Sequence, residues 1–205
     1  ASARSFRTGK KRTIGFIVPD ISNKFFATMI ESVENYLSSH GYHLIIANTK
    51  ENPDREEVNI RLLSAGLVDG LLVASTMGDF SRFEALIPAG FPVVLVDRGV
   101  TADPSLYVTH IFADALKEGA NAFNWVDEYM TAEGKTPRAG GDQFQVAILE
   151  GTVGSSVAAD RLQGFTDAMA EKAMELIGGN IRQFVASRDN EEAACNMMLG
   201  STLAG

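Results

Sequence analysis

Apolar runs alternate with segments of helical period along the first half of the chain. Residues 13–18 are almost entirely apolar and predict a buried strand, and the apolar positions after them recur every three or four residues up to Gly41, which predicts a helix. Asn52 and Pro53 are placed as the N-cap and first turn of a second helix. The predicted strands are 13–18, 43–48, 70–74, 92–97 and 106–111, with a short helix at 81–89. Continuous apolar strands between helices are typical of a parallel sheet covered on both faces.

The alternation starts again after Asp114, so we expect a second lobe. Helices are predicted at 115–130, 156–174 and 191–199, and strands at 145–150 and 181–187, with a Gly-rich loop at 131–142. The predicted division is a basic linker (1–12), an N-terminal lobe (13–105) and a C-terminal lobe (106–205). The predicted fold class is α/β, each lobe being a doubly wound parallel sheet. Two strands leave the second lobe with little core, so we expect it to be incomplete and the chain to be a fragment.

The composition is that of a globular protein. Of 205 residues, 45% are hydrophobic and 21% charged, and apolar runs such as 91–96 are far shorter than the ~20 residues that span a bilayer. The single cysteine, Cys195, excludes an internal disulfide and fits no metal-ligand spacing, and we expect it to be buried. We therefore expect a soluble, cytoplasmic protein with no metal and no cofactor.

Charge is distributed unevenly along the chain. The net charge is −8, which argues against nucleic acid covering most of the surface. Residues 1–12 nevertheless hold five basic side chains and no acid, Arg4, Arg7, Lys10, Lys11 and Arg12. This segment is either a solvated terminus or a linker to a nucleic-acid-binding module.

Ligands of open parallel sheets bind beyond the carboxyl ends of the strands, where the strand order reverses. The rule selects four loops, at 20–26, 74–77, 97–98 and 151–156. In the first loop, Phe25 and Phe26 begin a helix and are joined by two polar side chains, Asp20 and Asn23. One ring can face the core while the other covers a ligand, or both rings can be core.

Asp97 and Arg98 close a fully apolar strand. Asp97 accepts hydroxyl protons and Arg98 donates to hydroxyl or ring oxygens, as a polyol requires, and an ion pair between the two is the structural alternative. In the second lobe, Asp114 is a further carboxylate at the crevice, and Arg161 follows the loop 151–156, whose N–H groups suit an anion or a hydroxyl oxygen. A surface ion pair is the alternative for Arg161, with Asp160 or Asp167.

Catalytic motifs are absent from the sequence. It contains no GxGxxG, no phosphate-binding loop, no GxSxG and no HExxH. His40, His43 and His110 lie in a helix end and in strands, so we expect them to be structural or exposed. We therefore expect a binding protein and not an enzyme.

The same residues carry a resemblance to a known family. Residues 4–10 (RSFRTGK), 12–23 (RTIGFIVPDISN), 52–57 (NPDREE), 68–72 (VDGLL) and 92–98 (PVVLVDR) resemble the hinge and first lobe of LacI/GalR-type bacterial transcription regulators. Further along, 147–156 (AILEGTVGSS) and 160–165 (DRLQGF) are similar to ribose-type periplasmic sugar-binding proteins. Both groups share a two-lobed periplasmic binding protein-like fold.

The resemblance implies a site and a function. It implies sugar contacts at Asn23, Phe25, Phe26, Asp97, Arg98 and Arg161, with the phenylalanines stacking on the ligand. It also implies that Arg4, Arg7 and Lys10 lie in a hinge close to DNA. The sequence departs from the pattern at Lys24, where a proline is usual, at Ala115, where Asn is common, and after Ser187, where an aromatic residue is expected.

The resulting hypothesis is the effector-binding core of a LacI-type regulator. A small sugar-like effector would bind between two lobes and control DNA binding by a helix-turn-helix headpiece that this sequence lacks, in a homodimer. The alternative is a solute-binding protein of a sugar ABC transporter, which a signal peptide in the complete gene would support. An enzyme is the third class, and turnover of a bound sugar would reveal it.

Overall fold

The computed structural model describes residues 10–79, 87–133 and 146–204, and the chain divides into two compact units, Ala1–Ala113 and Asp114–Gly205. Each unit is described by itself below. The division falls later than the predicted lobe boundary after residue 105. The reason is that strand β5 (Thr109–Ile111) pairs with β4 (Val93–Val96) and so completes the first sheet.

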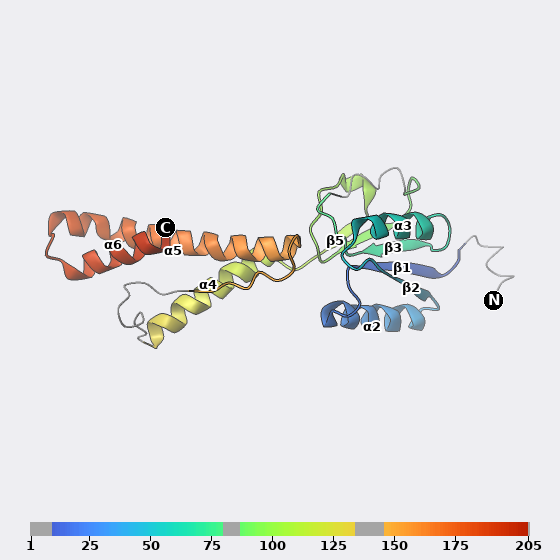
Figure 1. Cartoon of the computed structure of the whole chain (residues 1–205), viewed down its shortest axis with the longest axis horizontal. Coiled ribbons are helices and arrows are strands. Elements are labelled where there is room, and N and C mark those ends of the chain that lie inside the picture. Colours follow the sequence, from blue (N-terminus) through green and yellow to red (C-terminus); the bar gives the residue numbers. More distant parts are fainter. Residues whose placement is uncertain (1–9, 80–86, 134–145, 205) are drawn as a thin grey trace. The chain divides into compact units, whose positions relative to one another are not determined.

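The first unit is a parallel five-stranded sheet in the order β2-β1-β3-β4-β5 (Figure 1). Its remaining strands are β1 (Thr13–Val18), β2 (His43–Asn48) and β3 (Gly70–Val73), its helices are α2 (Lys24–Ser39) and α3 (Pro53–Ser64), and a 3-10 turn, η2 (Pro104–Leu106), precedes β5. The five strands predicted for this half are present, and the fifth is shorter than predicted, because Leu106 belongs to η2. Of the predicted helix 81–89, residues 81–86 lie outside the described residues and 87–89 are not helical.

Both faces of the central strands β1, β3 and β4 are buried, as their continuous apolar runs predicted, whereas the edge strands β2 and β5 are partly exposed. Helices α2 and α3 cover opposite faces of the sheet (Figure 1). Phe16 and Val18 of β1 pack with Phe26 of α2, whereas Ile17 packs with Ile60 of α3. Phe16, Ile17 and Val18 are each 0% exposed. Because successive side chains of a strand point to opposite faces, one strand supplies both halves of the core.

The helices of the first unit begin where the sequence predicted. The Asn52 side chain accepts a hydrogen bond from the Arg55 N–H (3.0 Å) and Pro53 occupies the first turn of α3. The Asn23 side chain caps α2 by accepting from the Phe25 N–H (3.0 Å). Both caps satisfy N–H groups that have no partner within the helix.

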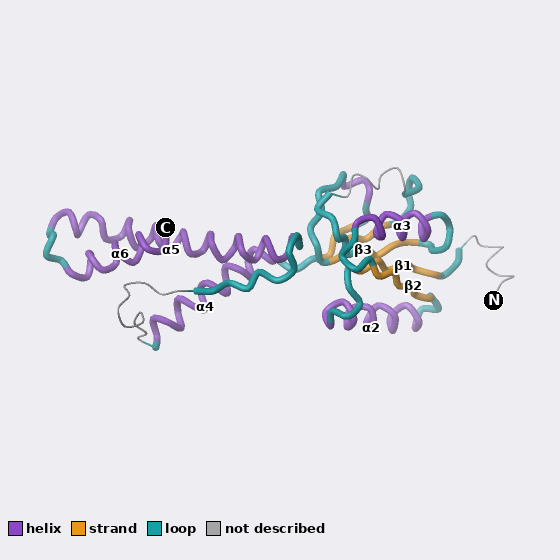
Figure 2. Tube along the Cα trace, in the orientation of Figure 1, coloured by secondary structure: helices purple, strands orange, loops and turns teal. Residues whose placement is uncertain are grey.

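The second unit consists, in its described residues, of three helices and connecting loops (Figure 2). They are α4 (Ala115–Ala132), α5 (Ser156–Ala186) and α6 (Glu191–Ala204), with α4 and α6 both packed on α5. The helices predicted at 115–130 and 191–199 are confirmed, and the one at 156–174 is longer than predicted. Among the helices described here, none has an apolar stretch long enough to cross a bilayer.

The two strands predicted in the second unit are wrong. Residues 146–150 are exposed and belong to no strand, and residues 181–186 continue helix α5. A parallel strand is stable only beside a hydrogen-bonded neighbour, and the described part of this unit holds none, whereas a helix makes its hydrogen bonds within the segment. A doubly wound second sheet is therefore not present in the described residues.

Two glycines allow α4 and α5 to cross at close range. A Cβ atom placed on Gly119 would lie 2.0 Å from the Arg161 carbonyl oxygen, and one on Gly164 would lie 1.9 Å from the Leu116 oxygen. The crossing is extended by Phe123 and Phe165, whose rings meet edge to face with centroids 5.4 Å apart. Any side chain at either glycine would separate the helices.

Candidate ligand-binding site

The strand order of the first unit reverses between β1 and β3, which places the expected ligand-binding crevice at the carboxyl ends of these two strands. The chain passes from β1 outward to β2, then returns across β1 to β3, so the connections after these neighbouring strands leave on opposite faces. This reversal is where open α/β sheets bind ligands. The loops predicted to carry the site in the first unit follow β1, β3 and β4, and parallel pairing brings all three to the same edge.

The loop after β1 holds an ionised carboxylate. Asp20 accepts hydrogen bonds from the Ser22 N–H (2.9 Å) and the Ser22 hydroxyl (2.8 Å). These bonds, the backbone one first, hold the pKa of Asp20 below its ordinary value, and the charge of Lys50 acts in the same direction. The carboxylate keeps free lone pairs, because two donors do not saturate its oxygens.

The two phenylalanines after this loop have different roles in the structure. Phe26 is 3% exposed and lies in the core, whereas Phe25 is 52% exposed. Their rings meet edge to face with centroids 5.1 Å apart, so the buried Phe26 ring packs against the Phe25 ring and limits its movement. About half of the Phe25 side chain is therefore exposed, and the expectation that Phe26 also stacks on a ligand does not agree with its burial.

The loop after β4 contains strained backbone. Asp97 has φ +65°, and the Arg98 N–H donates to the Val96 carbonyl oxygen (2.8 Å), so Asp97 is the central residue of a γ-turn. The Asp97 N–H donates to the Ile111 oxygen (2.8 Å), which ties the turn to the end of β5. A positive φ at a residue other than glycine costs free energy, and such strain concentrates at functional sites.

Arg98 forms a bidentate ion pair with Glu51, in the loop after β2. The guanidinium Nη1 and Nη2 atoms each lie 2.7 Å from one carboxylate oxygen, and the Arg98 side chain is 8% exposed. The loop that carries Glu51 is itself strained, with φ +53° at Lys50 and +54° at Glu51. The alternative that we considered for Arg98 was a pair with Asp97, and the sequence analysis did not identify Glu51.

A second carboxylate that the sequence analysis missed holds the loop after β3. Glu56 in the first turn of α3 is 0% exposed and accepts hydrogen bonds from the Ser75 hydroxyl (2.6 Å) and the Thr76 N–H (2.6 Å). An acidic residue in a first helical turn is common, so its sequence position only indicated a helix start. The structure shows that it anchors the crevice loop 74–77.

His110 of β5 lies close to this edge. Its Nε2 atom is buried and has no hydrogen-bond partner among the described residues, and its ring lies 4.6 Å from that of Phe112. Burial lowers the pKa of His110, and a hydrogen bond with the Arg98 backbone and the charge of Asp97 partly oppose the effect. His40 and His43 are exposed, as predicted.

The site residues predicted for the second unit are on its surface. Asp114 accepts from the Lys117 N–H (3.0 Å) and caps α4. The Arg161 Nε atom lies 2.7 Å from the Glu118 carboxylate, so its ion-pair partner is neither Asp160 nor Asp167. Both side chains of this pair are about half exposed, at 54% and 45%.

The loop before α5 contains two glycines with positive φ. Gly151 has φ +86° and Gly154 φ +83°, values that glycine adopts without strain. Ser155 precedes α5 without a side-chain cap, and the Ser156 hydroxyl is buried and has no partner in the described residues.

The basic segment at the start of the chain is described only from residue 10 onward. Arg4 and Arg7, both predicted to lie in the hinge, are outside the described residues. The Asp69 carboxylate accepts hydrogen bonds from the Lys11 N–H (2.9 Å) and the Arg12 N–H (2.6 Å), and Arg12 has φ +56°. Asp69 therefore fixes the end of this segment to the start of β3.

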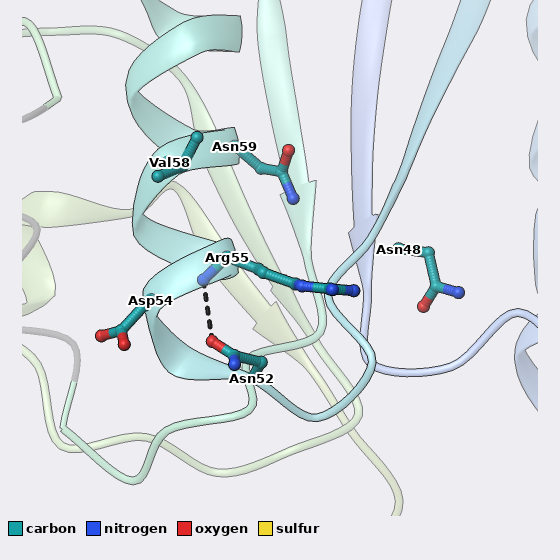
Figure 3. Close-up of a pocket in the computed structure, with 6 residues that line it drawn as sticks. All are labelled: Asn48, Asn52, Asp54, Arg55, Val58 and Asn59. Atoms are coloured by element: carbon teal, nitrogen blue, oxygen red, sulfur yellow. Dashed lines mark hydrogen bonds between the residues drawn. The ribbon is translucent and has the colours of Figure 1, made fainter.

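Two hollows in the first unit lie away from the predicted ligand residues. One, of about 360 Å³, is at the end of the edge strand β2, where Arg55 extends toward Asn48 (Figure 3). The other, of about 470 Å³, is at the opposite end of β4 and is lined by residues 87–92 and 105–108.

No group of His, Cys, Asp and Glu in the described ranges could hold a metal ion. Cys195 is exposed on α6, so the expectation that it is buried is wrong.

Comparisons with known proteins agree on one type of domain. Residues 14–200 match the model of a family described as "Periplasmic binding protein domain". The sucrose operon repressor of Klebsiella pneumoniae is 33% identical over 174 residues, which are 85% of this chain and 47% of the relative. A ribose operon repressor of Haemophilus influenzae is 32% identical over 178 residues, 86% of this chain and 48% of the relative. The chain thus spans about half the length of these relatives.

Solved structures share the fold. A galactofuranose binding protein gives a TM-score of 0.66 at 22% identity, with 94% of this chain and 71% of the other covered. The periplasmic binding component of an arabinose ABC transporter from Shewanella sp. ANA-3 gives 0.65 at 21% identity, with 92% and 68% covered. Identities at this level establish the architecture alone.

Proposed function

Because the chain belongs to the periplasmic binding protein domain family and its sequence relatives include operon repressors, we propose that it is the ligand-sensing core of a bacterial transcription regulator. The predicted resemblance to LacI/GalR-type regulators is confirmed by these relatives. Several parts of the hypothesis go further and are proposals: a DNA-binding headpiece outside this chain, a homodimer, a cytoplasmic location and the absence of catalysis.

The observation that carries the proposal is the arrangement after β4. A strained Asp97 stands beside a buried, oriented Arg98, at the edge where Asp20 and the exposed ring of Phe25 are also placed. Carboxylates accept hydroxyl protons, a guanidinium donates to oxygen, and an aromatic face covers the apolar side of a sugar ring. Together these groups suit a small polyhydroxyl ligand.

Ligand binding would act by shifting a conformational equilibrium. A ligand that binds one arrangement of the two units more tightly favours that arrangement, and by linkage DNA binding changes ligand affinity by the same factor. The sheet of the first unit is connected to the basic segment before β1, because Asp69 accepts hydrogen bonds from the N–H groups of Lys11 and Arg12. We propose that residues 4–12 connect to the headpiece, where their positive charge favours the DNA backbone.

A solute-binding protein of a sugar transporter is the second candidate. The sugar-binding structures above support it at the level of the fold, and the similarity of 147–165 to ribose-type proteins supports it in sequence. If the full-length protein binds a specific operator DNA and a sugar releases it from that DNA, the result would support the regulator over the transporter protein.

Thermal melting of this chain with a panel of neutral sugars and sugar phosphates tests the ligand-sensing proposal. A ligand at 100 times its dissociation constant stabilises the folded state by about 2.7 kcal/mol, and one compound of the panel is expected to do so. Asp97→Asn should abolish the shift while the chain still folds, because Asn tolerates a positive φ but carries no charge.

The control is Asp160→Asn, which removes one exposed carboxylate from α5. It should leave the ligand-induced shift unchanged. A panel that produces no shift in a chain that melts cooperatively, or a shift that survives in Asp97→Asn, would contradict the proposed site.

A further inference from the structure

The pair formed by Glu51 and Arg98 joins two loops that are far apart in both sequence and sheet. Glu51 follows β2 and Arg98 follows β4, and the order β2-β1-β3-β4 places two strands between them. The Glu51 N–H donates to the Pro19 carbonyl oxygen (3.0 Å), so the loop after β2 lies over the end of β1, and the pair spans the carboxyl end of β3 from there to the loop after β4. Those two strand ends define the crevice, which makes the pair part of its floor.

The geometry of the pair limits what Arg98 can offer a ligand. A guanidinium has five N–H donors and one positive charge. The two 2.7 Å contacts engage one N–H on each terminal nitrogen, and the Glu51 carboxylate balances the charge. The remaining N–H groups of Arg98 can still donate to hydroxyl or ring oxygens of a ligand. The ion pair that they belong to carries no net charge.

The acidic side chains near Arg98 add negative charge, and the other cations at this edge lie in the loop after β2 and at the starts of α2 and α3. Asp20 is ionised, since its hydrogen bonds with Ser22 favour the carboxylate, and Asp97 adds a second acidic side chain beside Arg98. The further cations are Lys24 at the start of α2, Lys50 in the loop after β2, and Arg55 of α3, which extends toward Asn48 (Figure 3). A phosphate monoester brings about two negative charges at neutral pH, and beside Arg98 these would face the Asp97 carboxylate and a guanidinium whose charge Glu51 already balances.

We propose that Glu51 is a specificity-determining residue, which neutralises Arg98 and makes the site select uncharged polyhydroxyl ligands over their phosphate esters. This inference rests on the proposed ligand-binding function. Glu51 also acts as a positioning residue, because a bidentate pair fixes the plane of the Arg98 guanidinium and so the direction of its free donors.

The test measures dissociation constants by calorimetry for matched pairs of compounds: ribose and ribose 5-phosphate, arabinose and arabinose 5-phosphate, fructose and fructose 1-phosphate, and glucose and glucose 6-phosphate. In the unaltered chain, the neutral member of the pair that binds should bind at least about tenfold more tightly than its ester. Glu51→Gln should reduce this preference by about tenfold, because it leaves the Arg98 charge unbalanced. Glu34→Gln, which removes an exposed carboxylate from α2, should leave the preference unchanged.

The outcomes separate this inference from the proposed function. An ester that binds the unaltered chain as tightly as its parent sugar overturns the selectivity and leaves the ligand-sensing function standing. An unchanged preference in a folded Glu51→Gln variant overturns the role of Glu51. If that variant fails to melt cooperatively, the ratio of the two dissociation constants in the unaltered chain decides whether the site is selective. If none of the compounds binds the unaltered chain, both proposals are overturned.

Discussion

Single residues at the carboxyl edge of the first sheet work through partners that are distant in sequence. Arg98 pairs with Glu51, and Ser75 with Glu56. The crevice rule identified Asp97 and Arg98 because it needs only the strand ends, which apolar runs reveal. It could not identify the two glutamates, because their importance arises from contacts that exist only after β2, α3 and β4 have come together.

The histidine of β5 gives this edge a pH response. Burial lowers the pKa of His110, so the unfolded chain binds a proton more readily than the folded one. The contribution of His110 to the free energy of unfolding is therefore complete above the unfolded pKa of about 6.5 and falls as the pH drops through the lower folded value. Urea denaturation should give a lower stability at pH 5.5 than at pH 7.5, and His110→Phe should reduce that difference.

The control for this experiment is His43→Gln. His43 is exposed, so its replacement should leave the pH dependence as it is. Asp20 and Asp103 titrate below this pH window, because hydrogen bonds with Ser22 and Ser105 lower their pKa values. An equal pH dependence in the unaltered chain and in His110→Phe would show that His110 does not cause it.

At the scale of elements, the second unit depends on a close helix crossing. Leu116 and Arg161 place backbone oxygens where a side chain on Gly164 or Gly119 would lie. Sequence patterns predicted both helices from their period but not this contact, because each glycine considered alone only weakens a helix. Residues 181–186 also belong to helix α5. Their composition favours a strand, but a helix can form all its hydrogen bonds within the segment.

Gly164→Ala should loosen this crossing. The new Cβ would lie 1.9 Å from the Leu116 oxygen, so the helices must separate, at a cost of about 1–3 kcal/mol. Amide hydrogen exchange of the whole chain should show faster exchange in α4 and the first half of α5.

Gly178→Ala in the same helix is the matched control. A Cβ at Gly178 meets nothing within 4 Å, so alanine should slow exchange in α5, in line with a helix-propensity gain of about 1 kcal/mol. Unaltered protection of α4 in Gly164→Ala would mean that the crossing does not need a glycine there.

At the scale of the whole molecule, Asp69 links the start of β3 to the basic segment that precedes β1. Its carboxylate holds the N–H groups of Lys11 and Arg12 directly before β1. Asp69→Ala should free this segment, and trypsin should cleave after Lys11 or Arg12 about tenfold faster, because local opening costs less free energy. Glu34→Ala, at an exposed position on α2, should leave the cleavage rate unchanged. Equal rates in Asp69→Ala and the unaltered chain would remove this role from Asp69.

The sequence by itself determined the first unit, its five strands, its parallel class, the Asn52 helix cap and the family. Those features depend on local period, capping residues and continuous apolar runs, which neighbouring positions encode directly. Only the tertiary structure decided that Phe26 is core and Phe25 exposed, that Glu51 balances Arg98, that Glu56 anchors the loop after β3, and that the described second unit is helical. Each of these depends on which distant segment lies opposite, because burial, ion pairing and strand formation all require a partner that local sequence does not specify.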